Sequence, residues 1–345
     1  MTPRRSRDEE APLRAAALTG PDRIVLRDAP APMKGELPTV RVVSVGICGT
    51  DLKIAAGAIP VDYPRVMGHE IVGTVIAGAG AGPPVGSTVL VDPGITCGAC
   101  AQCRAGRGNI CTGGWLLGRD RDGGLQDELR VPAANLHVLG PGIAADTAPL
   151  IQVLATCVHG QRMAAPVAGA PVVIVGLGVT GLLHLQLAKL AGAGPVIGIT
   201  RSPEKLRLAE ELGADLTVAA DASDLADQVR EATGDGAELV VECAGSVATL
   251  ATAVRLAAIG GRILVYGTIP QTAGELPFYE LYYKELVLTH PRSARAADFP
   301  VAIDAVASGR VLLEPLVSER FPLTETASAI DAGRRSGALK IFVDP

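Results

Sequence analysis

The sequence is poor in aromatic residues and contains no long apolar run. Phe, Trp and Tyr make up 3% of its 345 residues. No stretch reaches the roughly 18 consecutive apolar residues of a membrane-spanning helix, so we expect no contact with a membrane. Residues 1–12 are polar and lack the apolar segment of a secretion signal. We therefore expect a cytoplasmic protein with a mobile tail over residues 1–12.

Long basic segments are also absent from the sequence. Lys and Arg total 31 against 36 Asp and Glu, which gives a formal net charge of -5. This balance argues against nucleic acid as a partner. Hydrophobic residues make up 48% of the chain and charged residues 19%, which is typical of a folded protein. The length allows two domains.

Four of the seven cysteines fall in one short segment, CGACAQCRAGRGNIC, spaced C-x2-C-x2-C-x7-C. A reducing compartment disfavours disulfides and favours metal or catalytic use of such thiols. Four sulfurs can surround a zinc ion and leave no open position, so we predict a structural zinc site. An iron–sulfur cluster and four unrelated surface cysteines are the alternatives. The predicted ligands are Cys97, Cys100, Cys103 and Cys111.

A second group of candidate ligands lies upstream. GICGTDLKI places Cys48 after a strand-like segment, and GHEIVGTVI places His69 and Glu70 at the start of another. A buried structural Cys and a core His would give the same pattern. A catalytic zinc needs about three protein ligands and one open position, so a third ligand has to come from elsewhere in the chain.

From about residue 170 the sequence repeats a short apolar run, a glycine turn and an amphipathic helix. This pattern predicts a doubly wound parallel sheet with helices on both faces. Gly176, Gly178 and Gly181 form a G-x-G-x-x-G motif between a predicted strand and helix. In that context the motif predicts that a dinucleotide pyrophosphate binds at the helix N-terminus.

The end of the second predicted strand favours NADP(H) over NAD(H). Thr200 and Arg201 stand where an NAD enzyme would carry an acidic residue. A hydroxyl beside a guanidinium suits a 2'-phosphate. Alternatively, Arg201 lies over the adenine, while Ser202 caps the next helix and Pro203 occupies its first turn.

Together these motifs resemble the zinc-dependent medium-chain dehydrogenases, the alcohol and polyol dehydrogenase family. The likeness runs from about Ala16 to the C-terminus and also includes SGRVLLEPLVSERFPL. It implies a β-rich, GroES-like catalytic domain with an inserted Rossmann domain. The implied boundaries are a catalytic domain at 13–160 with its zinc lobe at 93–113, a Rossmann domain at 161–298, and a return to the catalytic domain at 299–345.

The resemblance also implies the ligands of a catalytic zinc. Cys48 and His69 would bind the ion, with Glu70 beside them as an outer or interchangeable ligand. The third ligand of these enzymes is a Cys, Asp or Glu, and its position holds Gln152 here. A neutral amide is the weaker ligand. Either Gln152 binds zinc, Glu70 replaces it, or the site is weakly occupied; we favour bound zinc. Thr156 matches a threonine that contacts the nicotinamide.

In this family zinc lowers the pKa of a bound alcohol, and hydride passes to the nicotinamide. Thr50 matches the start of a proton relay, and Lys53 stands where many relatives carry a His; Lys53 would pass the proton on or hold the cofactor. Arg292 matches an Arg that faces the substrate in polyol-processing relatives. Trp115 either lines the cleft or packs in the core. With so few aromatic residues, we expect a secondary alcohol or ketone on a sugar, polyol or cyclitol as the substrate.

Two other functions fit parts of the sequence. A zinc-independent quinone or enone reductase of the same superfamily would lack Cys48 and the four-cysteine segment, which argues against it. A non-catalytic NADP(H)-binding sensor could have lost its catalytic metal through Gln152. Since relatives are usually dimers or tetramers, we expect a homodimer or homotetramer.

Overall fold

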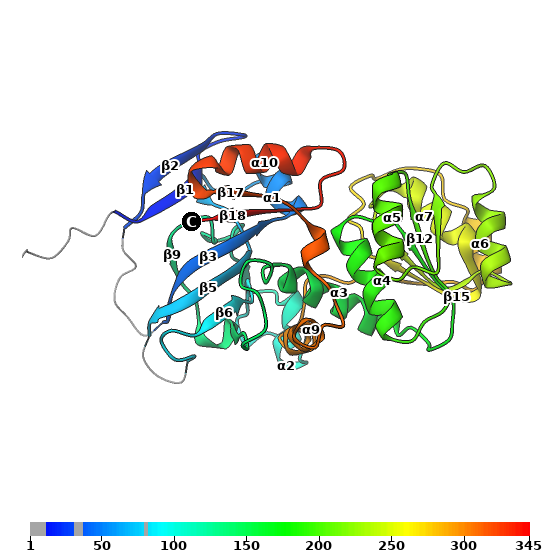
Figure 1. The fold of residues 1–345 in the computed structure, drawn as a ribbon, viewed down its shortest axis with the longest axis horizontal. Helices are drawn as coiled ribbons and strands as arrows, with labels where there is room; N and C mark the ends of the chain where they lie inside the picture. Colours follow the sequence, from blue (N-terminus) through cyan, green and yellow to red (C-terminus); the bar gives the residue numbers. More distant parts are fainter. Residues whose placement is uncertain (1–11, 31–36, 79–81) are drawn as a thin grey trace, which may run out of the picture.

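The computed structural model describes residues 12–30, 37–78 and 82–345. Figure 1 shows a β-rich part that contains the C-terminus and an α/β part beside it. Residues 1–11, most of the expected tail, lie outside the described residues. The two parts match the predicted fold class, a GroES-like β-rich domain with a Rossmann domain.

Within the described residues, the β-rich part is built on a seven-stranded sheet. The strand order is β10-β6-β5-β3-β18-β17, with β9 paired to β3. β18 pairs antiparallel with β3, so the last strand of the chain lies beside a strand from its N-terminal part. The sheet comprises β3 (Thr39–Ile47), β5 (Glu70–Ala77), β6 (Thr88–Val91), β9 (Glu128–Arg130), β10 (Leu136–Val138), β17 (Val317–Pro322) and β18 (Lys340–Asp344).

Smaller elements surround this sheet. β1 (Arg14–Leu18), β2 (Ile24–Asp28) and β4 (Arg65–Val66) form one small sheet, and β7 (Gly94–Ile95) pairs with β8 (Trp115–Leu116) in the four-cysteine lobe. The helices of this part are α1 (Gly49–Ala55), α2 (Ala101–Arg104) and α10 (Thr326–Arg334). The 3-10 turns are η1 (Gly108–Ile110), η2 (Ala133–Asn135), η3 (Glu314–Leu316) and η4 (Leu323–Glu325).

In the α/β part, six described strands form a parallel sheet in the order β13-β12-β11-β14-β15-β16. The order reverses direction at β11, and in such sheets ligands bind at the carboxyl ends of the strands beside that point. The strands are β11 (Val172–Val175), β12 (Val196–Thr200), β13 (Leu216–Ala219), β14 (Ala237–Glu242), β15 (Ala257–Val265) and β16 (Val287–Thr289). The helices are α4 (Val179–Leu190), α5 (Pro203–Glu211), α6 (Leu225–Thr233), α7 (Val247–Leu256) and α8 (Phe278–Tyr283).

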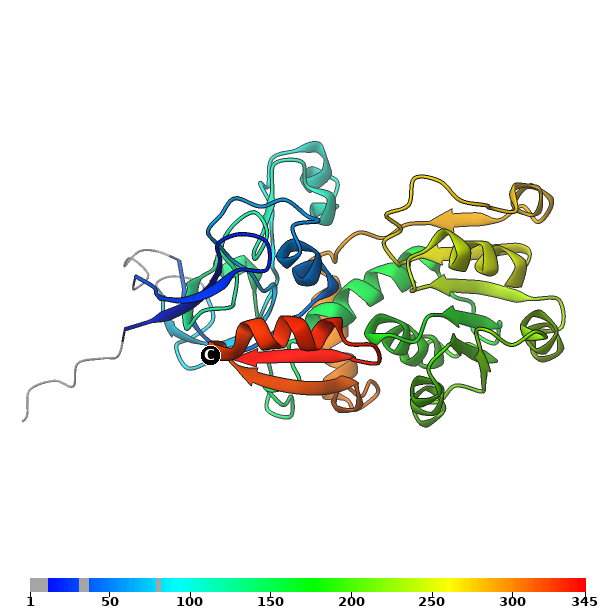
Figure 2. The same ribbon diagram turned by 90° about the horizontal axis from the view of Figure 1, so that it is seen from above.

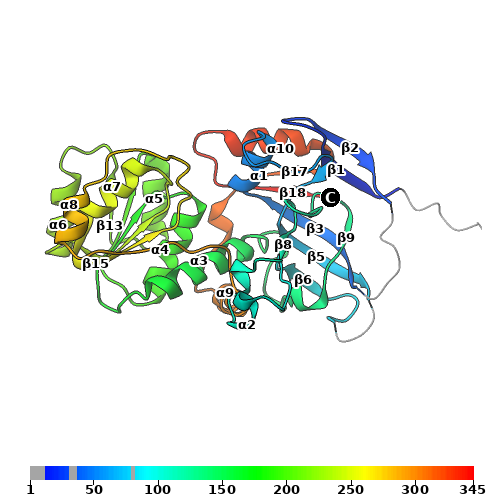
Figure 3. The ribbon, with the colours of Figure 1, turned by 180° about the vertical axis from the view of Figure 1, so that it is seen from behind.

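The chain crosses twice between the two parts. The first crossing is α3 (Leu150–Ala164), which Figure 2 shows in green between them. The second is the segment 290–297, which leads from β16 into α9 (Asp298–Ala307). Figure 3 shows α3 and α9 in the region where the two parts meet. One apolar core includes residues of α3, α4 and α9, so α3 and the helix that follows the second crossing pack together.

Among the helices of the described residues, none combines the length and apolar character needed to cross a membrane.

Candidate active site

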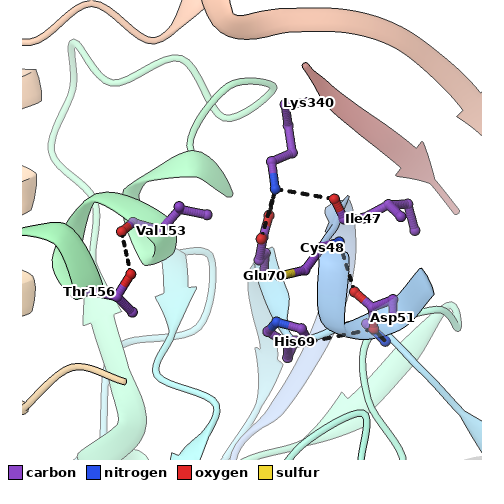
Figure 4. Close-up of polar contacts among 9 residues, drawn as sticks. Ile47, Cys48, Asp51, His69, Glu70, Val153, Thr156 and Lys340 are labelled. Atoms are coloured by element: carbon purple, nitrogen blue, oxygen red, sulfur yellow. Dashed lines mark hydrogen bonds and ion pairs between the residues drawn. The ribbon is translucent and has the colours of Figure 1, made fainter. Parts of the chain in front are cut away.

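Three side chains that can bind a metal ion converge where β3 ends and β5 begins. Cys48, His69 and Glu70 each offer one ligand atom, and these atoms lie within 4.8 Å of one another. Figure 4 shows the three side chains gathered around one region. Ligands around a tetrahedral zinc ion lie roughly 3.5 Å apart, so this group fits zinc with small side-chain adjustments.

Strand pairing brings these residues together. β3 and β5 are antiparallel neighbours, and Gly46 stands opposite Glu70 in their register. Gly46 is required there, because an added Cβ would collide with the carboxylate of Glu70. Gly68 has a φ of +89°, which allows the chain to turn just before His69. Buried Val40, Val42 and Val45 fix β3 in the core and so hold its end, where Cys48 follows.

Asp51 orients His69 and the start of α1. It is completely buried, and its Oδ2 accepts a hydrogen bond of 2.9 Å from the backbone N–H of Cys48. Its Oδ1 accepts one of 3.2 Å from Gly68 N and lies 3.5 Å from Nδ1 of His69. Burial opposes ionisation of Asp51, but His69 and these N–H groups outweigh it and lower the Asp51 pKa. A carboxylate on one imidazole nitrogen directs the other nitrogen toward the metal.

The same ion pair changes the protonation of the imidazole. Burial by itself would lower the pKa of His69, but the charges of Asp51 and Cys48 raise it well above the ordinary value. The metal-free site thus favours a proton on His69, and a metal ion has to displace that proton.

Lys340 neutralises Glu70 inside the protein. Its Nζ lies 2.7 and 2.8 Å from the two carboxylate oxygens and donates a further bond of 3.2 Å to the carbonyl of Ile47. The side chains of Lys340 and Glu70 are 5% and 0% exposed. Burial works against the charge on Lys340, but Glu70 and Cys48 raise the Lys340 pKa. Lys340 comes from β18, at the far end of the sequence, and Figure 4 shows it above Glu70.

The four cysteines of the lobe also converge. Their sulfurs lie within 4.8 Å of one another, and Cys97 and Cys111 approach to 3.4 Å. Four sulfurs at about 2.3 Å from a zinc ion lie roughly 3.8 Å apart, so the lobe fits zinc closely. Backbone N–H groups of Cys103 and Thr112 lower the pKa of Cys100 to about 5, whereas burial and its neighbouring thiols raise the pKa of Cys103 to about 11. The metal would bind all four as thiolates.

The glycine motif lies directly between β11 and α4, at the point where the strand order reverses. Gly176 has a φ of +96°, and an added Cβ on Gly181 would collide with the carbonyl of Gly176. Gly178 is the N-cap of α4, and a Cβ built there meets no described atom within 4 Å. This open side of Gly178 is the space that a pyrophosphate would occupy.

Thr200 and Arg201 lie at the carboxyl end of β12, next to β11. Arg201 is exposed. Ser202 caps α5 by accepting a hydrogen bond from the backbone N–H of Lys205, with Pro203 in the first turn. The local helix start therefore has the geometry expected from sequence, and it leaves the Arg201 side chain free for a cofactor.

α3 carries two further candidates between the metal cluster and the parallel sheet. Gln152 lies in its first turn and is 6% exposed. The hydroxyl of Thr156 donates to the carbonyl of Val153 at 2.6 Å and lies 2.5 Å from the hydroxyl of Tyr266. α3 packs against both β5 and β15, so it lies between the sheet that holds Glu70 and the parallel sheet.

The remaining candidates come from α1, β8 and the second crossing. Thr50 lies in the first turn of α1, partly buried, and Lys53 lies exposed in its last turn. Trp115 is on β8 and packs against the core of the β-rich part. Arg292 is exposed on the second crossing, with its backbone carbonyl bound to Asn109.

Asp51, Lys340 and Tyr266 were missed by our reading of the sequence. For Asp51 a signal was present, since a carboxylate three residues after Cys48 has the spacing of a capping box. Lys340 and Tyr266 reach the site through tertiary packing and have no local signal.

Two family models match the chain. Residues 35–141 match the alcohol dehydrogenase GroES-like domain, and residues 179–308 match the zinc-binding dehydrogenase model. A 2-dehydro-3-deoxy-L-galactonate 5-dehydrogenase from Pseudoalteromonas atlantica is 35% identical, over 89% of this chain and 90% of its own.

Solved structures with the same fold hold nicotinamide cofactors. A zinc-binding dehydrogenase from Sinorhizobium meliloti bound to NADP is 34% identical, with a TM-score of 0.90 over 97% of this chain and all of its own. An alcohol dehydrogenase from Escherichia coli in complex with NADH is 30% identical, with a TM-score of 0.88 over 96% of this chain and 99% of its own. The chain is an oxidoreductase and belongs to the zinc-type alcohol dehydrogenases of the medium-chain dehydrogenase family.

Proposed function

We propose that this protein transfers a hydride between NAD(P) and a secondary alcohol or ketone on a sugar, polyol or cyclitol. The observation that carries the proposal is the convergence of Cys48, His69 and Glu70 beside the helix that leads into the dinucleotide-binding sheet. The substrate class is supported by the sugar-acid dehydrogenase of Pseudoalteromonas atlantica, which is similar over nine-tenths of its length.

Cys48 and His69 would hold the catalytic zinc, with Gln152 as the third ligand. Lys340 binds both oxygens of Glu70, so in this arrangement Glu70 is the weaker competitor for the third position. When bound, zinc would supply a Lewis acid that lowers the pKa of a substrate hydroxyl, and the nicotinamide would exchange the hydride. The four-cysteine lobe would hold a second, structural zinc.

Other residues of the chain would orient the zinc ligands, move the substrate proton and bind the cofactor. Asp51 lies beside Nδ1 of His69, which would leave the other imidazole nitrogen for the zinc. Thr50, at the start of α1, would take up the substrate proton, and Lys53 would carry it to solvent or hold the cofactor. Thr156 would press against the nicotinamide, with Gly176, Gly178 and Gly181 around the pyrophosphate.

NADP(H) is the cofactor we favour. The similar structures hold NADP in one case and NADH in the other, so the family does not decide between them. The preference rests on Thr200 and exposed Arg201, which give a 2'-phosphate a cationic partner and no carboxylate to repel it.

The substrate pocket would use Arg292 for the polar end of the substrate and Trp115 as a wall. Arg292 lies on the second crossing between the two parts, and Trp115 lies on the hairpin of β7 and β8. The scarcity of aromatic residues elsewhere in the chain supports a polyhydroxylated substrate over a simple aliphatic alcohol.

We also propose a homodimer or homotetramer in the cytoplasm. Four aromatic side chains of α8 are between 61% and 79% exposed, and β16 beside them is an outer strand of the described sheet. Exposed apolar patches next to an edge strand are typical of subunit interfaces. Sedimentation velocity would show a species about two or four times the chain mass. Cysteines that serve as zinc ligands suit a reducing compartment such as the cytoplasm.

A substrate panel tests the activity. Sugars, sugar acids, polyols, cyclitols and simple alcohols are offered with each cofactor, together with quinones and enones. Oxidation of a polyhydroxylated substrate at least about tenfold better in kcat/KM than of ethanol or propan-2-ol supports the proposal. Reduction of an enone instead would identify the reductase, and cofactor binding with no turnover would identify the sensor.

A further inference from the structure

One side chain of the four-cysteine lobe touches both crossings between the two parts. Asn109 lies in η1, between Cys103 and Cys111. Its Nδ2 is 2.9 Å from the carbonyl of Arg292, on the second crossing, and 3.2 Å from Nε2 of His159, on α3. The four-cysteine lobe thus contacts both segments that connect the β-rich part with the α/β part.

The chemistry of the partners fixes the direction of these hydrogen bonds. The carbonyl of Arg292 can only accept, so the amide nitrogen of Asn109 faces it. The second N–H of the same nitrogen then faces Nε2 of His159, which accepts. The His159 proton is therefore on Nδ1, which lies 3.2 Å from Oδ2 of Asp298.

Asp298, the first residue of α9, extends this series of polar contacts. It is fully buried, and its Oδ2 also accepts a bond of 2.7 Å from the backbone N–H of Arg295. Its Oδ1 lies 2.8 Å from the guanidinium of Arg162, on α3. His159 is 1% exposed, so two segments far apart in sequence meet through buried polar groups. A buried polar contact such as His159–Asp298 holds one specific arrangement, because a displaced partner leaves an unpaired group. Asn109 adds a part-buried bond to His159 and an exposed one to the carbonyl of Arg292.

We propose that Asn109 is a positioning residue, through which the lobe holds α3 and the second crossing in the arrangement that catalysis needs. α3 carries Gln152 and Thr156, so a shift of this helix would move both relative to Cys48 and His69. The inference rests on the proposed function and gives the lobe a task besides binding metal. The hydrogen bonds of Asn109 do not involve the side chains of Gln152, Thr156 or Arg292.

Two substitutions separate hydrogen bonding from packing. Asn109→Ala removes the whole side chain beyond Cβ. Asn109→Leu keeps a similar volume but can make neither hydrogen bond, so it should behave like Asn109→Ala. The matched control is Asn135→Ala, because Asn135 Nδ2 also makes two bonds, both of 3.0 Å, to the carbonyls of Asp92 and Gly94 and contacts neither crossing through them.

Three experiments are made on the full-length, zinc-loaded proteins. Hydrogen exchange reports residues 150–164 and 290–298, metal analysis reports zinc per chain, and steady-state kinetics report kcat and KM. We expect both Asn109 variants to exchange faster in both segments and to lose at least about tenfold in kcat, since displacements of about 1 Å can cost more than that. Zinc content should equal that of the wild type, and Asn135→Ala should match the wild type in exchange of both segments.

Wild-type exchange and kcat in Asn109→Leu would overturn the inference, because packing alone would then explain the residue. Loss of zinc from the Asn109 variants, or faster exchange confined to residues 97–111, would overturn it in favour of a role within the lobe. If the wild type turns over no substrate of the panel, the proposed function fails, and the exchange measurement still decides whether Asn109 holds the crossings.

Discussion

Removing the charge of Lys340 should destabilise the protein strongly. Lys340 and Glu70 are almost completely buried, with Nζ 2.7 and 2.8 Å from the carboxylate oxygens. Lys340→Met leaves Glu70 without its cation and the carbonyl of Ile47 without its donor. Breaking one side of a buried ion pair costs about 3–5 kcal/mol. We expect the free energy of unfolding to fall by that amount.

A double-variant cycle isolates the pair. Glu70→Gln should also destabilise, because it leaves the ammonium unpaired. The combined Glu70→Gln, Lys340→Met protein contains no buried charge at this point, so its loss should be smaller than the sum of the single losses by at least about 2 kcal/mol.

Urea unfolding followed by tryptophan fluorescence measures these values. Trp115 is the only tryptophan of the sequence and packs against the core of the β-rich part, so it reports on the part that holds the pair. Lys340→Arg, which keeps the charge, is the control and should lose less than Lys340→Met. A loss below about 1 kcal/mol for Lys340→Met, or strictly additive single losses, would refute the role of this ion pair.

Three further outcomes are expected. Arg201→Ala should weaken NADPH binding about tenfold or more and NADH binding less, measured by cofactor fluorescence titration; equal losses would refute the 2'-phosphate assignment. Gln152→Glu should bind the catalytic zinc more tightly in a chelator competition, since a carboxylate is the stronger ligand, and unchanged affinity would exclude this side chain as a ligand. Burial raises the pKa of Asp92 from 3.8 to about 6. Its ionisation between roughly pH 4 and 6 therefore costs folding stability, by up to about 3 kcal/mol above that range, so Asp92→Asn should be more stable than the wild type at pH 7 and equally stable at pH 4 in thermal unfolding. A lower stability of Asp92→Asn at pH 7 would contradict this.

Short sequence patterns predicted the features that depend on residues close together in the chain. The glycine motif stands between a buried strand and a helix, as its spacing requires, and the four cysteines converge because the turns between them are short. Cys48 and His69 could be paired only through the family resemblance, because the register of β3 against β5 brings them together.

Groups that support the site from a distance could not be predicted. Lys340 reaches Glu70 because β18 returns beside β3, and Asn109 reaches His159 because the lobe folds onto α3. Neither contact leaves a periodic or spacing signal, since the partners are 270 and 50 residues apart. Polar residues buried by tertiary packing look, in sequence, like any surface residue.

Zinc content measured together with turnover tests the central claim most directly. The wild type should hold about two zinc ions per chain, one in each site. Cys48→Ala should lose one of them and all measurable turnover, while it binds NADPH as tightly as the wild type. A Cys48→Ala protein that keeps both ions and oxidises its substrate at the wild-type rate would contradict a catalytic zinc at this site.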